Sequence, residues 1–438
     1  MNVEVRQTES AVEKAVAEQF EKRAEALPGT DWVRELRSGA FARFAEKGLP
    51  HRRIEEWKYT DLRTLLRDLP PPASGGAAGI SPDTLGDIDA HRVTIVDGGQ
   101  PELPKAVEGV EIESFETALA GGDPAFADLL ASWPRGSDSP VLDLNTAFMN
   151  TGVVIRVKAG VQLDRPLHVT HVTRATEPSA VYARSVVILE DGAKATFIES
   201  YEGPDGVAYH VNAATRFQAG DKTDFTHIKV QREGDSAIHL ATLGGAVGAE
   251  AKLTLVPFTI GAALSRTNIA WRFDGADAVG NIAGVQILGG RQHADTTLFV
   301  DHREPNCGSR ELMKNVLDDR ARGVFQGMIL VRKDAQETDG KMMSQALMLS
   351  DGAEMDNKPE LEIYADNVAC GHGATTGNID EDLLFYLRSR GIPEVQAQAL
   401  LIEAFIAEAV EAIENEQIRE ALSGYAHDWV ARRKGQET

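Results

Sequence analysis

A cysteine and a histidine two positions apart are the residues of this sequence best suited to chemistry. Cys370 and His372 are separated by one glycine, and Gly373 follows the histidine. A thiolate and an imidazole both bind borderline or soft metal ions. On a strand, residues i and i+2 point to the same face, so both side chains could address one metal ion or one sulfur species. The alternative is a small buried thiol beside a hydrogen-bonded turn histidine, and for an arbitrary pair it is the commoner arrangement.

A second group of candidate ligands lies upstream. His293, Asp295 and His302 fall on neighbouring strands or turns, where histidine and aspartate could share a metal ion. Satisfied polar residues of a core or ladder are the more common reason for such a group. Cys307 follows Pro305-Asn306 and is expected to be a packing residue.

The common sequence motifs of catalysis are absent. The chain contains no GxxxxGK[ST], GxSxG, CxxC or HExxH. We therefore expect no P-loop ATP hydrolysis, no serine-hydrolase elbow and no structural zinc site within this chain. Glycine pairs such as Gly289-Gly290 lack the strand-to-helix context of a dinucleotide site.

Composition narrows the class of partner and the compartment. The 438 residues carry a net charge of −22, a field that repels phosphate backbones, so nucleic acid is not expected as a partner. No basic region followed by an apolar run marks a secretory signal, and no apolar run is long enough to span a membrane. Two cysteines are too few for a disulfide framework. These features predict a soluble cytoplasmic protein.

The elements that must position the candidate residues fall into five segments. Residues 1–68 predict an N-terminal helical unit, and a Pro/Gly/Ala-rich linker follows over 69–81. Within the N-terminal unit, the aromatic segment 52–62 is expected to pin the helices to the main body. Residues 82–150 mix strand and helix patterns without a clear arrangement. Residues 151–377 predict a β core, and residues 378–438 a C-terminal helical unit.

The β core is predicted from alternating hydrophobicity. Short segments such as 153–157, 167–172, 225–230 and 361–364 are bounded by Gly, Asp and Pro. No helical pattern alternates with them, which argues against a doubly wound fold. Numerous short strands suit either a sandwich or a β-solenoid, and periodicity alone leaves that choice open.

The C-terminal unit predicts helices that could pack on the core or on a partner. Asp380 is the expected N-cap of a helix that Gly391 ends, and Pro393 begins a longer helix. An apolar stripe follows that second helix, either as a packing face against the β core or as a contact with a partner protein. The stripe consists of Val395, Ala399, Ile402, Ile406, Ala409 and Ile413.

Longer runs resemble one family. The run KPELEIYADNVACGHGAT (358–375), followed by LFYLRSRG (384–391), closely resembles the SufB/SufD family of iron–sulfur cluster assembly. QHAD (292–295) with His302 and Pro305 is similar to the family's core, and EEWKYTDL (55–62) is similar to the N-terminal signature of its SufD branch. Gly373 after the histidine also resembles that branch, since the SufB branch has glutamate there. Position 367 departs from the family, because the resemblance predicts an aspartate after Asp366 and this chain has Asn367.

The resemblance implies a fold and a set of partners. It implies a mainly β protein with a right-handed parallel β-helix core, flanked by N-terminal and C-terminal helical units. Two β-helix cores would pair, one from this chain and one from a SufB subunit. The C-terminal helices would bind SufC, an ABC-type ATPase, so this chain would be a non-catalytic scaffold and ATP hydrolysis would occur in SufC.

The resemblance also implies roles for residues. His372 matches a proposed ligand of the nascent cluster at the SufB interface, a metal site shared with SufB, and Cys370 lies beside it. A transient iron–sulfur cluster would be the cofactor, with none bound by the isolated chain. The resemblance also allows for a flavin and for a homodimer of the isolated chain. The residues implied in the ATPase contact are Phe385, Tyr386, Arg388, Arg390 and Phe405.

Two other functions are weighed against the scaffold. A β-helix enzyme acting on acidic polysaccharide would need clustered catalytic acids and usually export, and the net charge would repel a polyanion. A stand-alone metalloenzyme would use His293, His302 and His372 as ligands together with Asp295.

Overall fold

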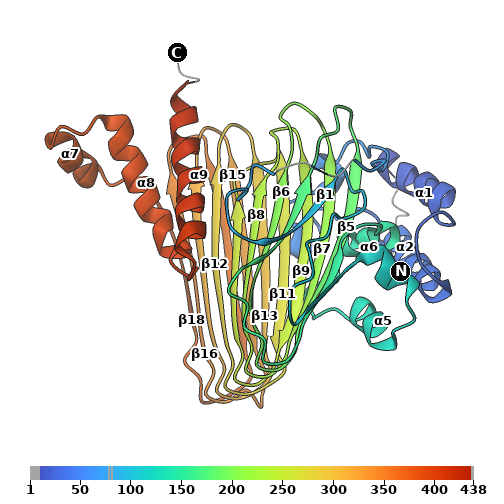
Figure 1. Cartoon of the computed structure of the whole chain (residues 1–438). Helices are drawn as coiled ribbons and strands as arrows, with labels where there is room; N and C mark the ends of the chain where they lie inside the picture. Colours follow the sequence, from blue (N-terminus) through green and yellow to red (C-terminus); the bar gives the residue numbers. More distant parts are fainter. Residues whose placement is uncertain (1–9, 77–78, 80–81, 436–438) are drawn as a thin grey trace, which may run out of the picture.

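The described chain winds into a parallel β-solenoid. A computed structural model describes residues 10–76, 79 and 82–435, and its strands form two nine-stranded sheets (Figure 1). Sheet I consists, in spatial order, of β1 (His91–Val96), β4 (Leu167–Val172), β6 (Lys194–Glu202), β8 (Asp224–Arg232), β10 (Lys252–Thr259), β12 (Val279–Leu288), β14 (Gly308–Leu317), β16 (Asp339–Met348) and β18 (Gly371–Asn378). Sheet II consists of β2 (Val110–Ser114), β3 (Val153–Val157), β5 (Ala180–Leu189), β7 (His210–Ala219), β9 (Ile238–Val247), β11 (Leu264–Phe273), β13 (His293–His302), β15 (Arg322–Val331) and β17 (Glu354–Ile363).

Successive strands from β3 onward alternate between the two sheets. From β5 to β16 each strand pairs in parallel with the strands two before and two after it. At the start of the solenoid, β4 pairs in parallel with β1, and β2 pairs with β3 in antiparallel orientation. The β core expected from the sequence is thus a solenoid and not a sandwich, as the family resemblance implied. No α-helix intervenes between β3 and β18, because each strand turns directly into the next coil.

Residues that face inward stack from coil to coil and fill the interior. One ladder of sheet II places Phe217, Gly245 and Trp271 in register. A Cβ on Gly245 would lie 2.2 Å from the Phe217 ring, so the glycine makes room between two large aromatic side chains. Such alternation of large and small residues gives the interior its close packing.

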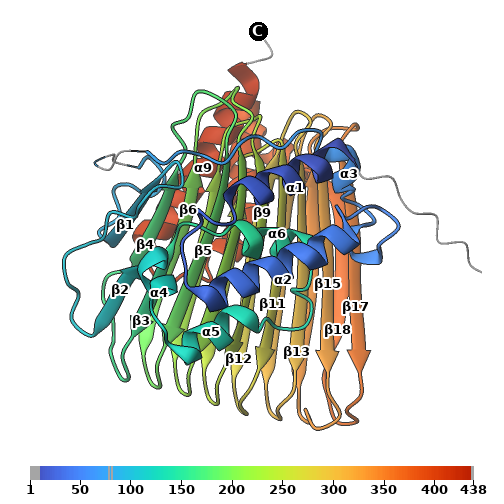
Figure 2. The same ribbon diagram turned by 90° about the vertical axis from the view of Figure 1, so that its right-hand side faces the viewer.

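The N-terminal helices cover the outer face of sheet II (Figure 2). They are α1 (Ala11–Arg23), α2 (Asp31–Lys47), the 3-10 turn η1 (Glu55–Trp57), α3 (Leu62–Leu65), α4 (Phe115–Ala120), α5 (Pro124–Ala131) and α6 (Pro140–Phe148). A capping box begins α1, in which Ser10 and Glu13 satisfy each other's backbone amides. Fully buried Arg184 of β5 ties α6 to the sheet, since its guanidinium donates to Asn145 at 2.9 Å and Thr146 at 2.7 Å.

The C-terminal helices pack on the opposite side of the solenoid. They are α7 (Glu381–Ser389), α8 (Glu394–Val410) and α9 (Glu416–Gly435), and α8 and α9 lie along sheet I while α7 projects away from it (Figure 1). Ile402, Ile406 and Ala409 of the predicted stripe are buried with Ile228 and Val285 of the sheet. No helix in the described ranges is long and apolar enough to cross a membrane.

The segments expected from the sequence map onto this fold as follows. Residues 82–150 contribute β1 to sheet I, β2 to sheet II and three helices to the N-terminal cover. Residues 1–9 of the expected N-terminal unit lie outside the described residues, as do 77–78 and 80–81 of the expected linker.

Candidate functional site

The Cys370–His372 pair lies at the end of the solenoid. β18 is the last strand of sheet I and pairs with β16, and β17 is the last strand of sheet II and pairs with β15 (Figure 2). Within the described ranges, no strand therefore pairs with the outer edge of β17 or of β18. A loop of seven residues joins the two strands and carries Cys370 immediately before β18 begins.

Both side chains lie on the side of β18 that faces the solenoid interior. The register places Glu311, Met342 and His372 in one column across β14, β16 and β18. Glu311 and Met342 are buried, while His372, as the last member of the column, is exposed. Cys370 is half-buried and packs against the interior apolar cluster. A thiol and an imidazole thus flank the open end of the interior, on one face.

Burial governs the acidity of the cysteine. Desolvation raises the pKa of the Cys370 thiol, the Gly340 backbone amide lowers it, and the nearby Asp339 and Glu311 carboxyls raise it. The isolated chain therefore favours a neutral thiol over a thiolate at Cys370.

A polar group lies two coils below the pair. Burial raises the pKa of Glu311 to about 8, opposed by a hydrogen bond from Ser309. The Ser309 hydroxyl also lies 3.0 Å from His302 Nε2. Burial lowers the pKa of His302 to about 4, so its imidazole is neutral. His302 therefore belongs to the interior and not to a surface metal site.

The other two residues of the predicted second group face the opposite way. His293 Nε2 lies 2.9 Å from the Thr60 hydroxyl, which also donates to Asp295. The same carboxylate pairs with Arg266, whose guanidinium stacks 3.8 Å from the Trp57 ring. The segment 55–60 is thereby pinned to sheet II, as the aromatic residues predicted.

The predicted second group therefore does not come together as one site. His293 and Asp295 form hydrogen bonds on the outer face of β13, and His302 points inward from the end of the same strand. Among the residues that the structure describes, no three of His, Cys, Asp and Glu are arranged to hold a metal ion. Within the described ranges, the four residues named for the metalloenzyme alternative therefore do not form one ligand set.

The five residues expected to contact an ATPase divide into two groups. Phe385 and Tyr386 of α7 are 73% and 53% exposed, and no residue of that helix is buried. Arg388 pairs with Glu394 at 3.4 Å, and Arg390 stacks 5.0 Å from the Tyr386 ring. Phe405 instead lies on the body side of α8, 4.6 Å from the Lys314 ammonium. Four of the five thus belong to an exposed surface, and Phe405 anchors α8 to the body.

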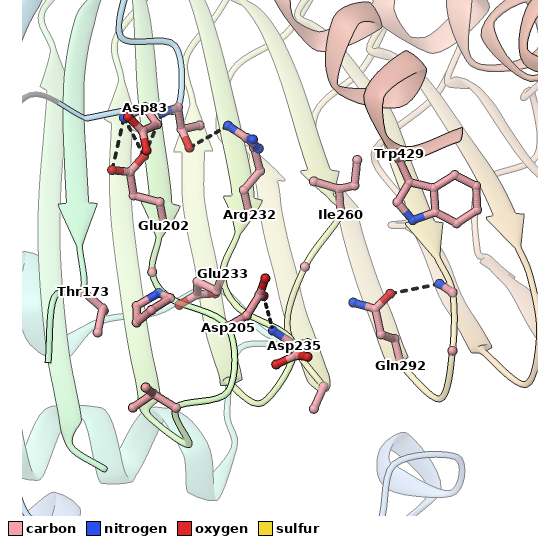
Figure 3. Close-up of a pocket in the computed structure, with 18 of the residues that line it drawn as sticks. Asp83, Thr173, Glu202, Asp205, Arg232, Glu233, Asp235, Ile260, Gln292 and Trp429 are labelled. Carbon is pink, nitrogen blue, oxygen red and sulfur yellow. Dashed lines mark hydrogen bonds between the residues drawn. The ribbon is translucent and has the colours of Figure 1, made fainter. Parts of the chain in front are cut away.

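Sequence reasoning missed a groove along one rim of the solenoid. It has a volume of about 1190 Å³ and runs past the ends of several sheet I strands towards α9 (Figure 3). Its charged residues are largely engaged: Arg232 stacks 4.0 Å from the Tyr425 ring, and Glu202 accepts from the Thr84 amide at 2.7 Å. The groove is lined by the turns that follow successive strands of sheet I. These turns lie far apart in the sequence, so no local pattern predicts that they line one groove.

A buried ionic network inside the first coils was also missed. Lys229 Nζ lies 2.7 Å from His239 Nε2, and His239 Nδ1 lies 2.8 Å from Glu233. Nearby, the Tyr201 hydroxyl donates to Glu199 at 2.6 Å. Burial lowers the pKa of Lys229 to about 8. The sequence signal for this network was the alternation of polar residues on β6 and β8, because every second residue of a strand faces the same side and here that side is the interior.

Comparison with known protein families covers most of the chain. The family model for the "SUF system FeS cluster assembly, SufBD core domain" matches residues 171–405, and that for the "SufBD protein N-terminal region" matches residues 11–68. The chain is 32% identical over 380 residues to the iron–sulfur cluster assembly protein SufD of Escherichia coli, and this aligned region covers 86% of this chain and 88% of that protein. It is also 32% identical over 394 residues to a SufBD family protein of Synechocystis, across 86% of each chain. Identity to SufD of Bacillus subtilis is 27% over 285 residues, 64% of each chain.

Proposed function

Because this chain belongs to the SufB/SufD family of iron–sulfur cluster assembly proteins, we propose that it is a non-catalytic scaffold subunit of a cytoplasmic Suf complex. In this proposal it pairs with a SufB subunit and carries the ATPase SufC on its C-terminal helices. The observation that carries the proposal is the open end of the solenoid, where Cys370 and His372 lie beside two strand edges that no described residue pairs with.

The strand edges support pairing with another β protein. An exposed strand presents a row of backbone donors and acceptors that a second chain can extend. β17 and β18 end the two sheets side by side, so a partner solenoid could continue both ladders at once. A SufB core is the partner we propose, and a second copy of this chain could use the same edges when SufB is absent.

The chemistry of the pair supports a shared site. Cys370 and His372 supply one thiol and one imidazole, whereas iron–sulfur clusters usually take four protein ligands. His372 is exposed at the edge, where residues of a partner could join it. We propose that His372 binds the nascent cluster together with SufB ligands, that Cys370 assists, and that the cluster leaves after assembly. A flavin, if the complex uses one, would be held by the assembled complex.

The exposed face of α7 supports a separate partner. Leu383, Phe385 and Tyr386 are each more than half exposed on a helix without buried residues. Clustered exposed apolar side chains of this kind mark protein contacts. We propose that this face, with Arg388 and Arg390, binds SufC. The chain has no P-loop, so a separate ATPase would supply ATP hydrolysis.

Co-purification tests the proposal. The full chain is co-expressed with its SufB and SufC, and iron and sulfide are measured in the complex and in the isolated chain. We expect all three proteins to elute together and iron to be retained only by the complex. Stoichiometric iron in the isolated chain would contradict a shared site.

Substitution of the histidine tests the site itself. His372→Ala should leave folding and pairing intact but lower the iron retained by the complex, because the side chain is exposed and supports no described contact. His427→Ala is the control, since that histidine is also exposed but lies on α9, where it pairs with Glu403 of α8 and not with the terminal coil. Loss of the complex in the His372 variant would mean that the residue serves pairing.

A further inference from the structure

The loop that delivers Cys370 and His372 is held by neutral amide side chains among acidic residues. The loop between β17 and β18 stacks on the loop between β15 and β16. Glu337 N donates to Asn367 O at 2.7 Å, and Ala369 N donates to Thr338 O at 2.8 Å. These two bonds hold the backbone on either side of Val368, immediately before the cysteine.

Two amide side chains complete this contact. Gln336 Oε1 accepts from Asn367 N at 3.1 Å, while its Nε2 donates to Lys333 O at 2.8 Å. Asn367 Nδ2 in turn donates to the Glu337 carboxylate. Asn367 is therefore tied to the preceding coil through its backbone amide, its carbonyl and its side chain.

The surroundings make the neutral amide important. Glu337 has φ +60°, so its backbone is fixed in the left-handed region by the turn. Asp334 and Asp366 add carboxylates to the same pair of loops. An aspartate at position 367 would bring a further negative charge against Glu337, whereas an amide donates a hydrogen bond to it.

We propose that Asn367 is a positioning residue for the Cys370–His372 half-site, acting through its hydrogen bond to Glu337. This inference rests on the proposed function, because it concerns the cluster-binding pair. Among the described residues β18 pairs on its β16 side alone, so the loop that precedes it is a further constraint on where the two ligands lie. A loop displaced by charge repulsion would carry both ligands away from the partner's ligands.

Asn367→Asp tests the proposal in the complex with SufB and SufC. Two carboxylates about 4 Å apart at a solvated surface repel by an amount equivalent to roughly a fivefold change in equilibrium. We therefore expect the iron retained per complex to fall roughly fivefold, with pairing to SufB unchanged by gel filtration. The loss should shrink in about 0.5 M salt, because screening weakens repulsion between exposed charges.

The double variant Asn367→Asp/Glu337→Gln is the matched rescue. It restores an amide–carboxylate pair with the roles exchanged, so iron retention should return to within about twofold of the unsubstituted complex. Equal loss in the single and double variants would overturn the proposal, as would normal iron in Asn367→Asp. Loss of SufB binding in Asn367→Asp would place the residue in the pairing surface instead.

His372→Ala separates failure of this inference from failure of the proposed function. If His372→Ala lowers iron retention and Asn367→Asp does not, only the positioning role fails. If His372→Ala retains normal iron, the proposed half-site fails and the positioning role fails with it.

Discussion

Removing the carboxylate of Asp295 should detach the N-terminal segment from the solenoid. Asp295 and Arg266 form an ion pair whose side chains are 0% and 3% exposed. Burial lowers the pKa of Arg266, and Asp295 raises it again. Asp295→Ala would remove the carboxylate that pairs directly with this buried guanidinium, and breaking such a pair costs about 3–5 kcal/mol. It would also remove the acceptor of the Thr60 hydroxyl.

Two further variants separate the charge from the shape. Thr60→Val removes one hydroxyl from the same cluster and should cost about 1–3 kcal/mol. Asp295→Leu with Arg266→Met replaces the whole pair by apolar side chains, which is often near neutral. We therefore expect the double variant to be more stable than Asp295→Ala, although each changes the same carboxylate.

Urea unfolding and hydrogen exchange together provide the assay. The midpoint of the first unfolding transition gives the loss of stability, and exchange at amides of 55–60 reports whether the segment has detached. A loss below about 1 kcal/mol in Asp295→Ala would refute the reasoning, since it would mean that Arg266 finds solvent without disturbing the fold. Equal loss in the double variant would show that side-chain shape, and not the uncompensated charge, controls stability.

Two other outcomes follow from the described contacts. The folded-state pKa of Glu311, about 8, lies above its unfolded value. This group should therefore make the protein less stable as pH rises from about 4.5 to 8. Glu311→Gln should remove this dependence of the urea unfolding midpoint on pH across that range. An unchanged slope would show that Glu311 is not the group responsible. Phe385→Ser with Tyr386→Ser should weaken SufC capture at least tenfold while leaving SufB pairing and the melting temperature unchanged, because α7 has no buried residues. Retained SufC capture would move the contact to another surface. Truncating the chain before α7 is a poorer test, since removing α8 and α9 exposes the apolar face around Ile228 and Val285.

The family resemblance predicted the solenoid, whereas periodicity alone did not distinguish it from a sandwich. The reason is visible in β5, where nine of ten residues are buried because the N-terminal helices cover its outer face. Alternation disappears when both faces are covered. β14 has a weak strand pattern for a different reason: Arg310, Glu311 and Lys314 interrupt its apolar residues, although the last two are buried.

The candidate sites show the same limits. The spacing of Cys370 and His372 could be interpreted from the sequence, because i, i+2 parity is a local property of strands. Whether His293 and His302 meet depended on their nine-residue separation along β13, which places them on opposite faces. The stripe on α8 packs against the sheet at Ile402 and Ile406, whereas Val395 is 44% exposed.

The attachment of the C-terminal helices has a mechanical consequence. α8 is fixed to the body through Lys314 of β14, whose ammonium lies 2.6 Å from Glu408, while α7 follows directly from the end of β18. Helix α7 is thus connected at one end to the terminal strand β18 and at the other end to α8, which contacts β14. The two attachments differ, because α8 packs on inner strands of sheet I whereas β18, among the described strands, is paired on one side only. A force transmitted along the chain from α7 therefore reaches β18 and, with it, the coil that carries Cys370 and His372.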